Sequence, residues 1–270
     1  MNRKFLSILL ALGMTCSMLG CSSEKSEAKK QFEMAVASLE DKEEKLDENI
    51  NNLQEIIDAG EPVLDESVID NANEAIKNAQ SAKYEVPEMG KEVEEIQKQT
   101  KEIEAVSYEE QETAIEEAKN ALNESIEKYK LVDCPTEDFV LKRVATVEHI
   151  TGVQAVTEDH DPNGNLNKAG SYTATVYMSC DYVNKDELYI EPGEDIVDVG
   201  TDGGAAVEVY TCKEDAIKRE EYLAGFDGTI FVSGSHKVVG TCLIRTSSYL
   251  TASQQKEIET AIIEALTKLN

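Results

Sequence analysis

The sequence predicts an α+β fold in two parts: an all-α bundle or coiled coil over residues 21–131, then an α+β domain with a mainly antiparallel sheet packed by helices over residues 132–270. Three observations predict it. In the first half, apolar residues recur every three or four positions, the spacing of a helix face. In the second half, they alternate in short runs bounded by turn residues, as in strands. Between the halves, Val132-Asp133-Cys134-Pro135 interrupts both patterns as a short linker.

The charge of the chain excludes one class of partner. The 270 residues contain 54 Asp and Glu against 26 Lys and Arg, a net charge of -28. Binding to nucleic acid depends on Lys and Arg that neutralise phosphates, so we expect no nucleic-acid partner. Trp is absent and aromatic residues make up 6% of the chain. This composition argues against a large aromatic-lined pocket for sugars or drug-like ligands.

The first twenty residues have the organisation of a secretory signal. Arg3 and Lys4 precede an apolar run over residues 5–14 that is too short for a dedicated membrane span. Leu19-Gly20-Cys21 resembles the lipobox of bacterial lipoproteins, although Met18 stands where that family usually has Leu. The resemblance implies that Cys21 is acylated and attaches the chain to the extracellular face of the cell membrane. The alternative is an ordinary signal peptide in which Cys21 is incidental.

The helical half begins with a seam of apolar residues spaced alternately by four and three positions, which is typical of a coiled coil. Gly60 and Pro62 end this first helix, expected over residues 26–58. Three more helices are expected over residues 66–83, 89–103 and 107–129. No such face is stable alone in water, so the helices form an antiparallel bundle or the first seam joins two copies of the chain. The seam consists of Phe32, Val36, Leu39, Leu46, Ile50, Leu53 and Ile57.

Residues 65–130 resemble the small helical repeats, called FIVAR-type, of Gram-positive extracellular adhesins. The similarity lies in the helical phase, the alanines and the spacing of Tyr108, Ala118, Leu122 and Tyr129. It implies a spacer or bundle shape and does not imply matrix binding.

The second half predicts a sheet with helices packed on one face. The expected helices cover residues 136–151, 214–225 and a terminal segment capped by Thr251. The expected strands cover residues 153–157, 172–180, 206–211, 229–233 and 238–246, with a weaker one at 187–190 and a hairpin turn at 234–237.

Several segments of this half, in the same order, resemble those of uncharacterised Gram-positive surface lipoproteins. They are residues 153–168, Gly200-Thr201-Asp202-Gly203-Gly204, and the runs 226–229 and 235–240. Because that family has no assigned activity, the resemblance implies a surface location and leaves the function open.

One polar loop is a candidate calcium site. Asp159, Asp161, Asn163 and Asn165 place oxygen-bearing side chains at alternate positions around Gly164, as in the first half of an EF-hand loop. Gly170 stands where that loop needs a bidentate Glu. The alternative is a tight turn, for which Asp, Pro, Asn and Gly are favoured residues.

A second candidate is the acidic loop 191–204, in which Asp195, Asp198 and Asp202 would bind a cation or a basic partner. Its alternative is a solvated loop, and its charge argues against a phosphate cradle. We expect this loop, the loop 158–170 and the hairpin turn that carries His236 to form the exposed binding surface.

Catalytic signals are few. His149, His160 and His236 show no paired metal-ligand spacing, and no nucleophile motif is present. The sequence leaves open whether Cys134, Cys180, Cys212 and Cys242 form disulfides or remain free. We therefore expect a non-enzymatic, lipid-anchored surface protein that binds an extracellular protein or small ligand. The alternatives are an envelope receptor or phage-exclusion or transport-associated lipoprotein, and a metal-dependent hydrolase.

Overall fold

The computed structural model describes residues 22–188, 190–229 and 234–269. The expected signal and Cys21, the expected site of lipid attachment, therefore lie outside the described residues. The described residues form two compact units, one of residues 22–53 with 75–116 and the other of residues 54–74 with the described residues from 117 to 269. The α+β class is confirmed: helices in the first half precede a five-stranded antiparallel sheet.

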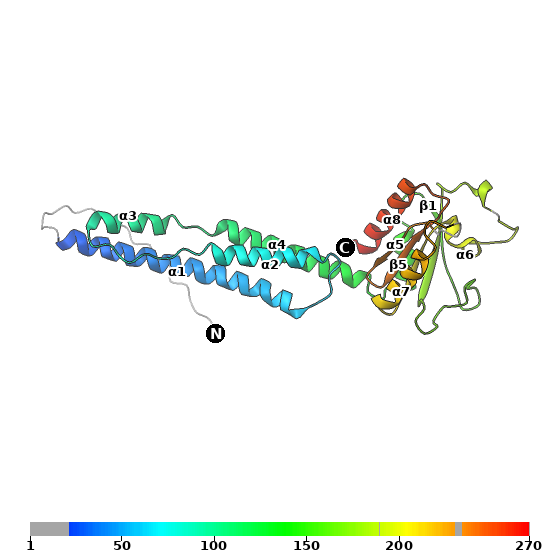
Figure 1. Ribbon diagram of the computed structural model, residues 1–270, viewed down its shortest axis with the longest axis horizontal. Helices are drawn as coiled ribbons and strands as arrows, with labels where there is room; N and C mark the ends of the chain where they lie inside the picture. Colours follow the sequence, from blue (N-terminus) through cyan, green and yellow to red (C-terminus); the bar gives the residue numbers. More distant parts are fainter. Residues whose placement is uncertain (1–21, 189, 230–233, 270) are drawn as a thin grey trace. The chain divides into compact units, whose positions relative to one another are not determined.

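The four helices expected in the first half are present. They are α1 (Ser22–Ala59), α2 (Ser67–Ser81), α3 (Val93–Glu104) and α4 (Glu109–Leu131), labelled in Figure 1. Helix α1 ends where Gly60 adopts a φ of 64°, a left-handed conformation that suits glycine. Within the described residues, none of the helices has the length and apolar character needed to cross a membrane.

Most of the predicted seam of α1 is buried. Phe32, Leu39, Leu46, Ile50 and Leu53 are 5% exposed or less, whereas Val36 and Ile57 keep part of their surface exposed. Side chains of the same chain cover the buried part of the seam.

In the first unit, Tyr108, which directly precedes α4, contacts both α1 and the segment between α2 and α3. Its hydroxyl donates a hydrogen bond to Glu43 of α1 (2.8 Å) and accepts one from the backbone N–H of Tyr84 (3.0 Å). Tyr84 belongs to residues 82–92, which form neither helix nor strand. Burial raises the pKa of Tyr108. A buried hydroxyl that both donates and accepts fixes this irregular segment against the helices.

The sheet of the second unit has the strand order β1-β2-β3-β5-β4, and every neighbouring pair is antiparallel. Its strands are β1 (Ile150–Ala155), β2 (Ala174–Cys180), β3 (Gly204–Val209), β4 (His236–Val239) and β5 (Cys242–Thr246). Helix α5 (Glu137–Val144) precedes β1, α7 (Lys213–Ala224) connects β3 to β4, and α8 (Ala252–Thr267) follows β5.

One face of the sheet carries the main core. Alternate side chains point to this face, including Val176 and Met178 of β2, Val207 of β3 and Ile244 of β5, and all four are fully buried. They pack against α5 and α8, whose buried residues include Val140, Val144, Ile258, Ile262 and Leu266.

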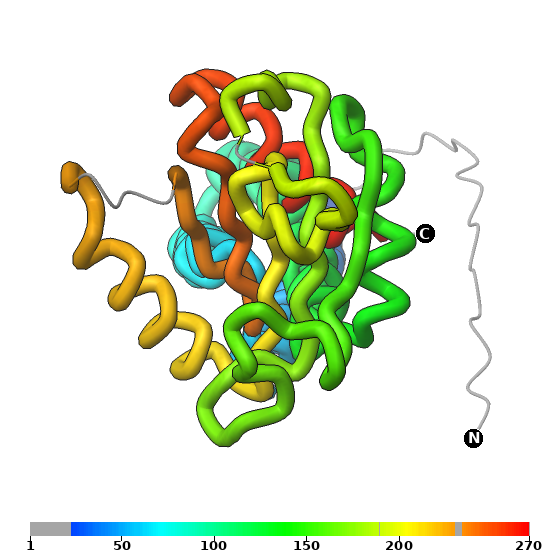
Figure 2. Tube along the Cα trace, turned by 90° about the vertical axis from the view of Figure 1, so that its right-hand side faces the viewer, coloured from blue at the N-terminus to red at the C-terminus, as the bar shows by residue number. Residues whose placement is uncertain are grey.

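The other face is also covered, which corrects the expectation of helices on one face only. Tyr177, Ala206 and Leu243 pack with Ala216 and Leu223 of α7. Figure 2 shows α7, in yellow-orange, alongside the orange strands β4 and β5. The same cluster takes Val156 and Tyr172 from the loop between β1 and β2, and Val197 from the short helix α6 (Ile196–Val199). The sheet thus lies between two apolar layers.

Two expected elements of the second half differ from the structure, and a third lies mostly outside the described residues. The helix expected over 136–151 ends at Val144, because the chain must turn before β1, and His149 adopts a φ of 70° in that turn. The weak strand at 187–190 is wrong: Lys185–Glu187 form a 3₁₀ helix that the Asn184 side chain caps. Of the strand expected at 229–233, residues 230–233 lie outside the described residues.

The expected hairpin turn at 234–237 is also wrong. His236 and Lys237 belong to β4, and the turn to β5 is made by Gly240 and Thr241, where Gly240 has a φ of 59°. Two-residue turns between antiparallel strands need a residue that tolerates positive φ, and Gly240 supplies it.

The residues expected as a linker are held to this turn. The carbonyl oxygen of Val132, which is fully buried, accepts hydrogen bonds from the N–H (2.9 Å) and the hydroxyl (3.1 Å) of Thr241. The same hydroxyl accepts the N–H of Cys134 (2.6 Å). The chain thus enters the sheet domain through a fixed joint within the second unit.

Candidate functional site

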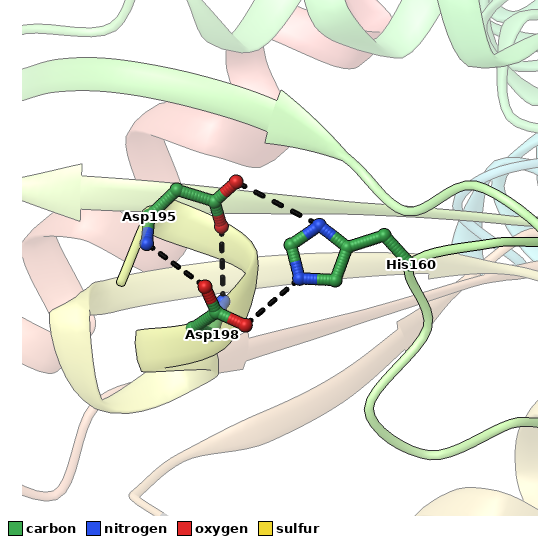
Figure 3. A group of neighbouring side chains, drawn as sticks. All are labelled: His160, Asp195 and Asp198. Atoms are coloured by element: carbon green, nitrogen blue, oxygen red, sulfur yellow. Dashed lines mark hydrogen bonds and ion pairs between the residues drawn. The ribbon is translucent and has the colours of Figure 1, made fainter. Parts of the chain in front are cut away.

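The two loops expected to bind a partner meet at one histidine. His160, from the loop between β1 and β2, places Nε2 2.8 Å from Asp198 Oδ1 and Nδ1 3.7 Å from Asp195 Oδ2. Figure 3 shows the imidazole ring between the two carboxylates, with one ring nitrogen facing each. The sequence named Asp195 and Asp198 as candidates but gave no signal that His160 joins them, since 35 residues or more separate it from either in the chain.

The short helix α6 orients the two carboxylates. Asp195 caps it by accepting the N–H groups of Val197 (2.9 Å) and Asp198 (3.2 Å), while the Asp198 side chain accepts the N–H of Asp195 (2.9 Å). This reciprocal arrangement is a capping box. Gln154 of β1 donates to the remaining oxygen of Asp195 (2.6 Å). Asp198 therefore keeps one oxygen for His160, whereas the Asp195 oxygen that faces His160 also accepts the hydrogen bond from Gln154.

The arrangement favours a protonated imidazole. The hydrogen bond to Asp198 raises the pKa of His160, aided by the negative charge of Asp195 and Asp198. The backbone N–H of Asp195 and the bond to His160 lower the pKa of Asp198. One ligand atom from each of the three residues lies within 4.8 Å of the others, so His160, Asp195 and Asp198 are also the described group that is able to hold a divalent cation.

We expect the His160 pair to stabilise the protein mainly at acidic pH. Because the folded-state pKa is raised, its contribution is complete below the unfolded histidine value of about 6.5 and is lost as pH rises through the folded value. His160→Gln should lower the melting temperature at pH 5.5 by about 1–2 °C, a small effect because the site is exposed, and by less at pH 8.5. Equal shifts at both pH values, measured by calorimetry, would contradict this.

Asp161 is the centre of a turn in the loop that was the calcium candidate. Its carboxylate accepts the backbone N–H groups of Asn163 (3.1 Å), Asn165 (2.7 Å) and Leu166 (2.8 Å), and the hydroxyl of Tyr172 (2.7 Å). Burial alone would raise the pKa of Asp161, but these hydrogen bonds lower it overall. The donors surround the carboxylate on both oxygens, and this geometry favours the turn interpretation of the loop over the cation interpretation.

The other candidate ligands of that loop point elsewhere. The Asn163 side chain donates to the hydroxyl of Tyr177 (3.2 Å), and Asp159 is exposed. Asn165 donates its backbone N–H to Asp161. Gly164 adopts a left-handed backbone conformation, with a φ of 59°. These side chains do not converge on one point in the way that an EF-hand loop requires.

Asp161→Ala should therefore destabilise the fold irrespective of calcium. Loss of the acceptor leaves Tyr172 and three backbone donors unpaired, which we expect to lower the free energy of unfolding by about 1–3 kcal/mol. Urea denaturation with calcium chloride and with a chelator measures this. A stabilisation of the parent protein by calcium that the variant lacks would instead restore the cation interpretation.

Asp202 and His236 lie apart from the His160 site. Burial raises the pKa of Asp202, which the positive charge of Arg245 opposes. The His236 side chain is 7% exposed, with Nδ1 2.9 Å from Glu220 and Nε2 3.3 Å from Asp227. His236 therefore ties β4 to α7 and its C-terminal turn. The expectation that His236 lies at an exposed hairpin tip is wrong, because His236 is the first residue of β4.

The most buried charge among the described residues of the second unit is Glu208, which no sequence pattern singles out. Glu208 of β3 is 1% exposed and accepts hydrogen bonds from Arg245 of β5 (2.8 Å), Nε of Arg219 of α7 (3.2 Å) and the Tyr210 hydroxyl (2.6 Å). Burial would raise the pKa of Glu208, but the two guanidinium charges and the Tyr210 bond outweigh it and hold the pKa below its ordinary value. Because side chains alternate along a strand, Glu208 and Tyr210 lie on the same face of the sheet. That face is buried because α7 packs against it.

The four cysteines of the second half are free thiols in the structure. Cys180 and Cys242 are buried, Cys212 is partly exposed and Cys134 is exposed. Burial raises the pKa of Cys242 to about 12, so it behaves as a small apolar side chain. Of the two alternatives that the sequence left open, the structure has the free thiols.

Comparison of the chain with protein-family models, with curated proteins and with solved structures finds no match. The function must therefore be argued from the residues themselves.

Proposed function

We propose that this chain is a lipid-anchored surface protein of the bacterial envelope that binds a partner through its second unit and has no catalytic role. The observation that carries the proposal is Leu19-Gly20-Cys21 after a short apolar run with basic residues before it. Acylation of Cys21 gives membrane attachment without a spanning helix. Helix α1 begins at Ser22, directly after that residue.

The described polar clusters support binding over catalysis. Glu208 is occupied by two arginines and a tyrosine, and His236 by two carboxylates. These contacts join strands to the helix α7. His160 likewise joins two loops. A general base must lie within hydrogen-bond reach of its substrate. The polar atoms of these groups are instead occupied by contacts that hold the elements of the fold together.

Replacement of the anchor residue tests the proposal. Cys21→Ser should lose incorporation of labelled palmitate and either appear in the medium or remain unprocessed, because serine offers no thiol for acylation. Fractionation of cells that express the parent chain, Cys21→Ser and the control Cys134→Ser, which removes an exposed thiol far along the chain, measures this. If Cys21→Ser is cleaved normally and stays fully in the membrane fraction, the anchor proposal is wrong.

A further inference from the structure

The described structure contains an open groove of about 770 Å³, which we call the junction groove. All of its lining residues belong to the second unit: the end of α1 and the following loop, the start of α2, the second half of α4, and the segment that leads into α7. Its volume falls in the range of ligand sites, which enclose several hundred cubic ångströms.

The floor of the junction groove is apolar and aromatic. Helix α1 contributes Ile56 and Ile57, and α4 contributes Leu122, Ile126 and Tyr129. Ile56, Ile57 and Tyr129 keep part of their surface exposed. A contact with the alkyl stem of a long side chain, or with an aromatic ring, would remove this remaining surface from water.

The rim carries negative charge. Five carboxylates and one ammonium group line the groove, and Lys213 is 3.8 Å from Glu66, while Glu61 pairs with Lys130 at 3.0 Å. Within the described part of the chain, the remaining carboxylates of the groove form no ion pair: Asp70, Asp133 and Glu214. An anionic ligand would be repelled here, and a cationic ligand attracted.

Tyr129 lines the groove together with two of those carboxylates, Asp133 and Glu214. Burial raises the pKa of Tyr129, and the negative charges of Asp133 and Glu214 raise it further. A groove that combines an aromatic ring with carboxylates suits an ammonium or guanidinium group, which gains from the ring face and from the charges together.

We propose that the junction groove binds a lysine- or arginine-containing segment of a partner protein, with a cationic side chain seated between Tyr129, Asp133 and Glu214. The carboxylates of the groove complement the positive charge of such a side chain, and the apolar floor is too large for a single side chain to cover. The assignment deepens the proposed binding role, on which it rests, by placing the site and naming the chemistry of the partner.

The tripeptide Lys-Trp-Lys is the probe for this site. The chain contains no Trp, so fluorescence of the peptide indole reports binding without background from protein tryptophan. We expect saturable binding to the purified full chain that weakens as sodium chloride is raised, because salt screens charges at an open site. The double variant Asp133→Asn, Glu214→Gln should raise the dissociation constant about tenfold, since it removes two of the carboxylates that line the groove with Tyr129.

A matched control removes the same number of charges elsewhere. Glu158→Gln with Glu264→Gln changes two exposed carboxylates of the same unit that do not line the groove, and should leave the dissociation constant within about twofold of the parent value. A melting curve for each variant shows that it is folded. Equal loss in both double variants would show a general effect of net charge and overturn the site.

Two further outcomes would overturn the proposal. If Glu-Trp-Glu binds as tightly as Lys-Trp-Lys, the groove selects the indole and not the charge. If tryptamine, a single amine on the same ring, binds as tightly as the peptide, the occupant is a small organic cation and not a protein segment. Neither outcome affects the anchoring of Cys21, which fractionation measures independently.

Discussion

Glu208→Ala is expected to lower the free energy of unfolding of the sheet domain by about 3–5 kcal/mol. Glu208 is 1% exposed and neutralises Arg245, whose side chain is 11% exposed, and Arg219, whose side chain is 28% exposed. Removal of one member of a buried ion pair is costly because the remaining charge has neither water nor a partner. Here a single substitution leaves two guanidinium groups and the Tyr210 hydroxyl without their shared acceptor.

Urea denaturation followed by circular dichroism measures the effect. Glu221→Ala is the matched control, because it removes an exposed carboxylate from α7, the helix that carries Arg219, and should change the free energy by less than about 0.5 kcal/mol. Glu208→Gln keeps the shape of the side chain and removes its charge. If Glu208→Gln is as stable as the parent, the charge of Glu208 contributes nothing and the ion-pair argument is wrong.

The same residue gives the fold a dependence on acid pH. Because the folded-state pKa of Glu208 lies below its ordinary value, its contribution is complete above the unfolded carboxyl value of about 4.3. The contribution is lost as pH falls through the folded value. The difference in stability between the parent and Glu208→Gln should therefore shrink as the pH is lowered through that region.

The sequence predicts those elements of the fold that depend on neighbouring residues, and it does not predict those that depend on residues distant in the chain. Helix positions follow from local periodicity, and the first four helices and strands β2 and β3 lie within a few residues of their expected positions. The turn between β4 and β5 was misplaced because Asp227, Gly228 and Gly234 give stronger turn signals than the single Gly240. Gly240 is distinguished by its φ and by its contact with Val132, and neither can be read from the neighbouring sequence.

The acidic residues of the His160 site could be recognised one by one from the sequence. The grouping of polar residues into clusters could not be recognised. Asp195 and Asp198 stood out by composition, but His160 reaches them only because the loop between β1 and β2 folds back over β2 toward α6. Glu208 lies in a strand that was expected, but the strand pattern alone does not show on which side that residue is covered. The side on which α7 packs decides that it is buried, and strand alternation carries no information about which face a later helix covers.

Gly240→Ala is expected to lower the free energy of unfolding by about 3 kcal/mol. Alanine at a φ of 59° costs roughly 1–2 kcal/mol. In addition, the new Cβ would collide with the carbonyl oxygen of Val132, which is backbone and cannot rotate away. That oxygen accepts two hydrogen bonds from Thr241, so its displacement also breaks the joint through which the chain enters the sheet domain.

Gly164→Ala separates the two contributions. Gly164 has the same φ of 59°, but nothing lies within 4 Å of the position that its Cβ would occupy. It should therefore cost only the conformational part, about 1 kcal/mol. Hydrogen exchange adds a local readout: Gly240→Ala should speed exchange of the Thr241 amide, which Gly164→Ala leaves protected. If the two substitutions cost the same and the Thr241 amide stays protected in both, the collision is relieved by small shifts and Val132 does not hold the turn.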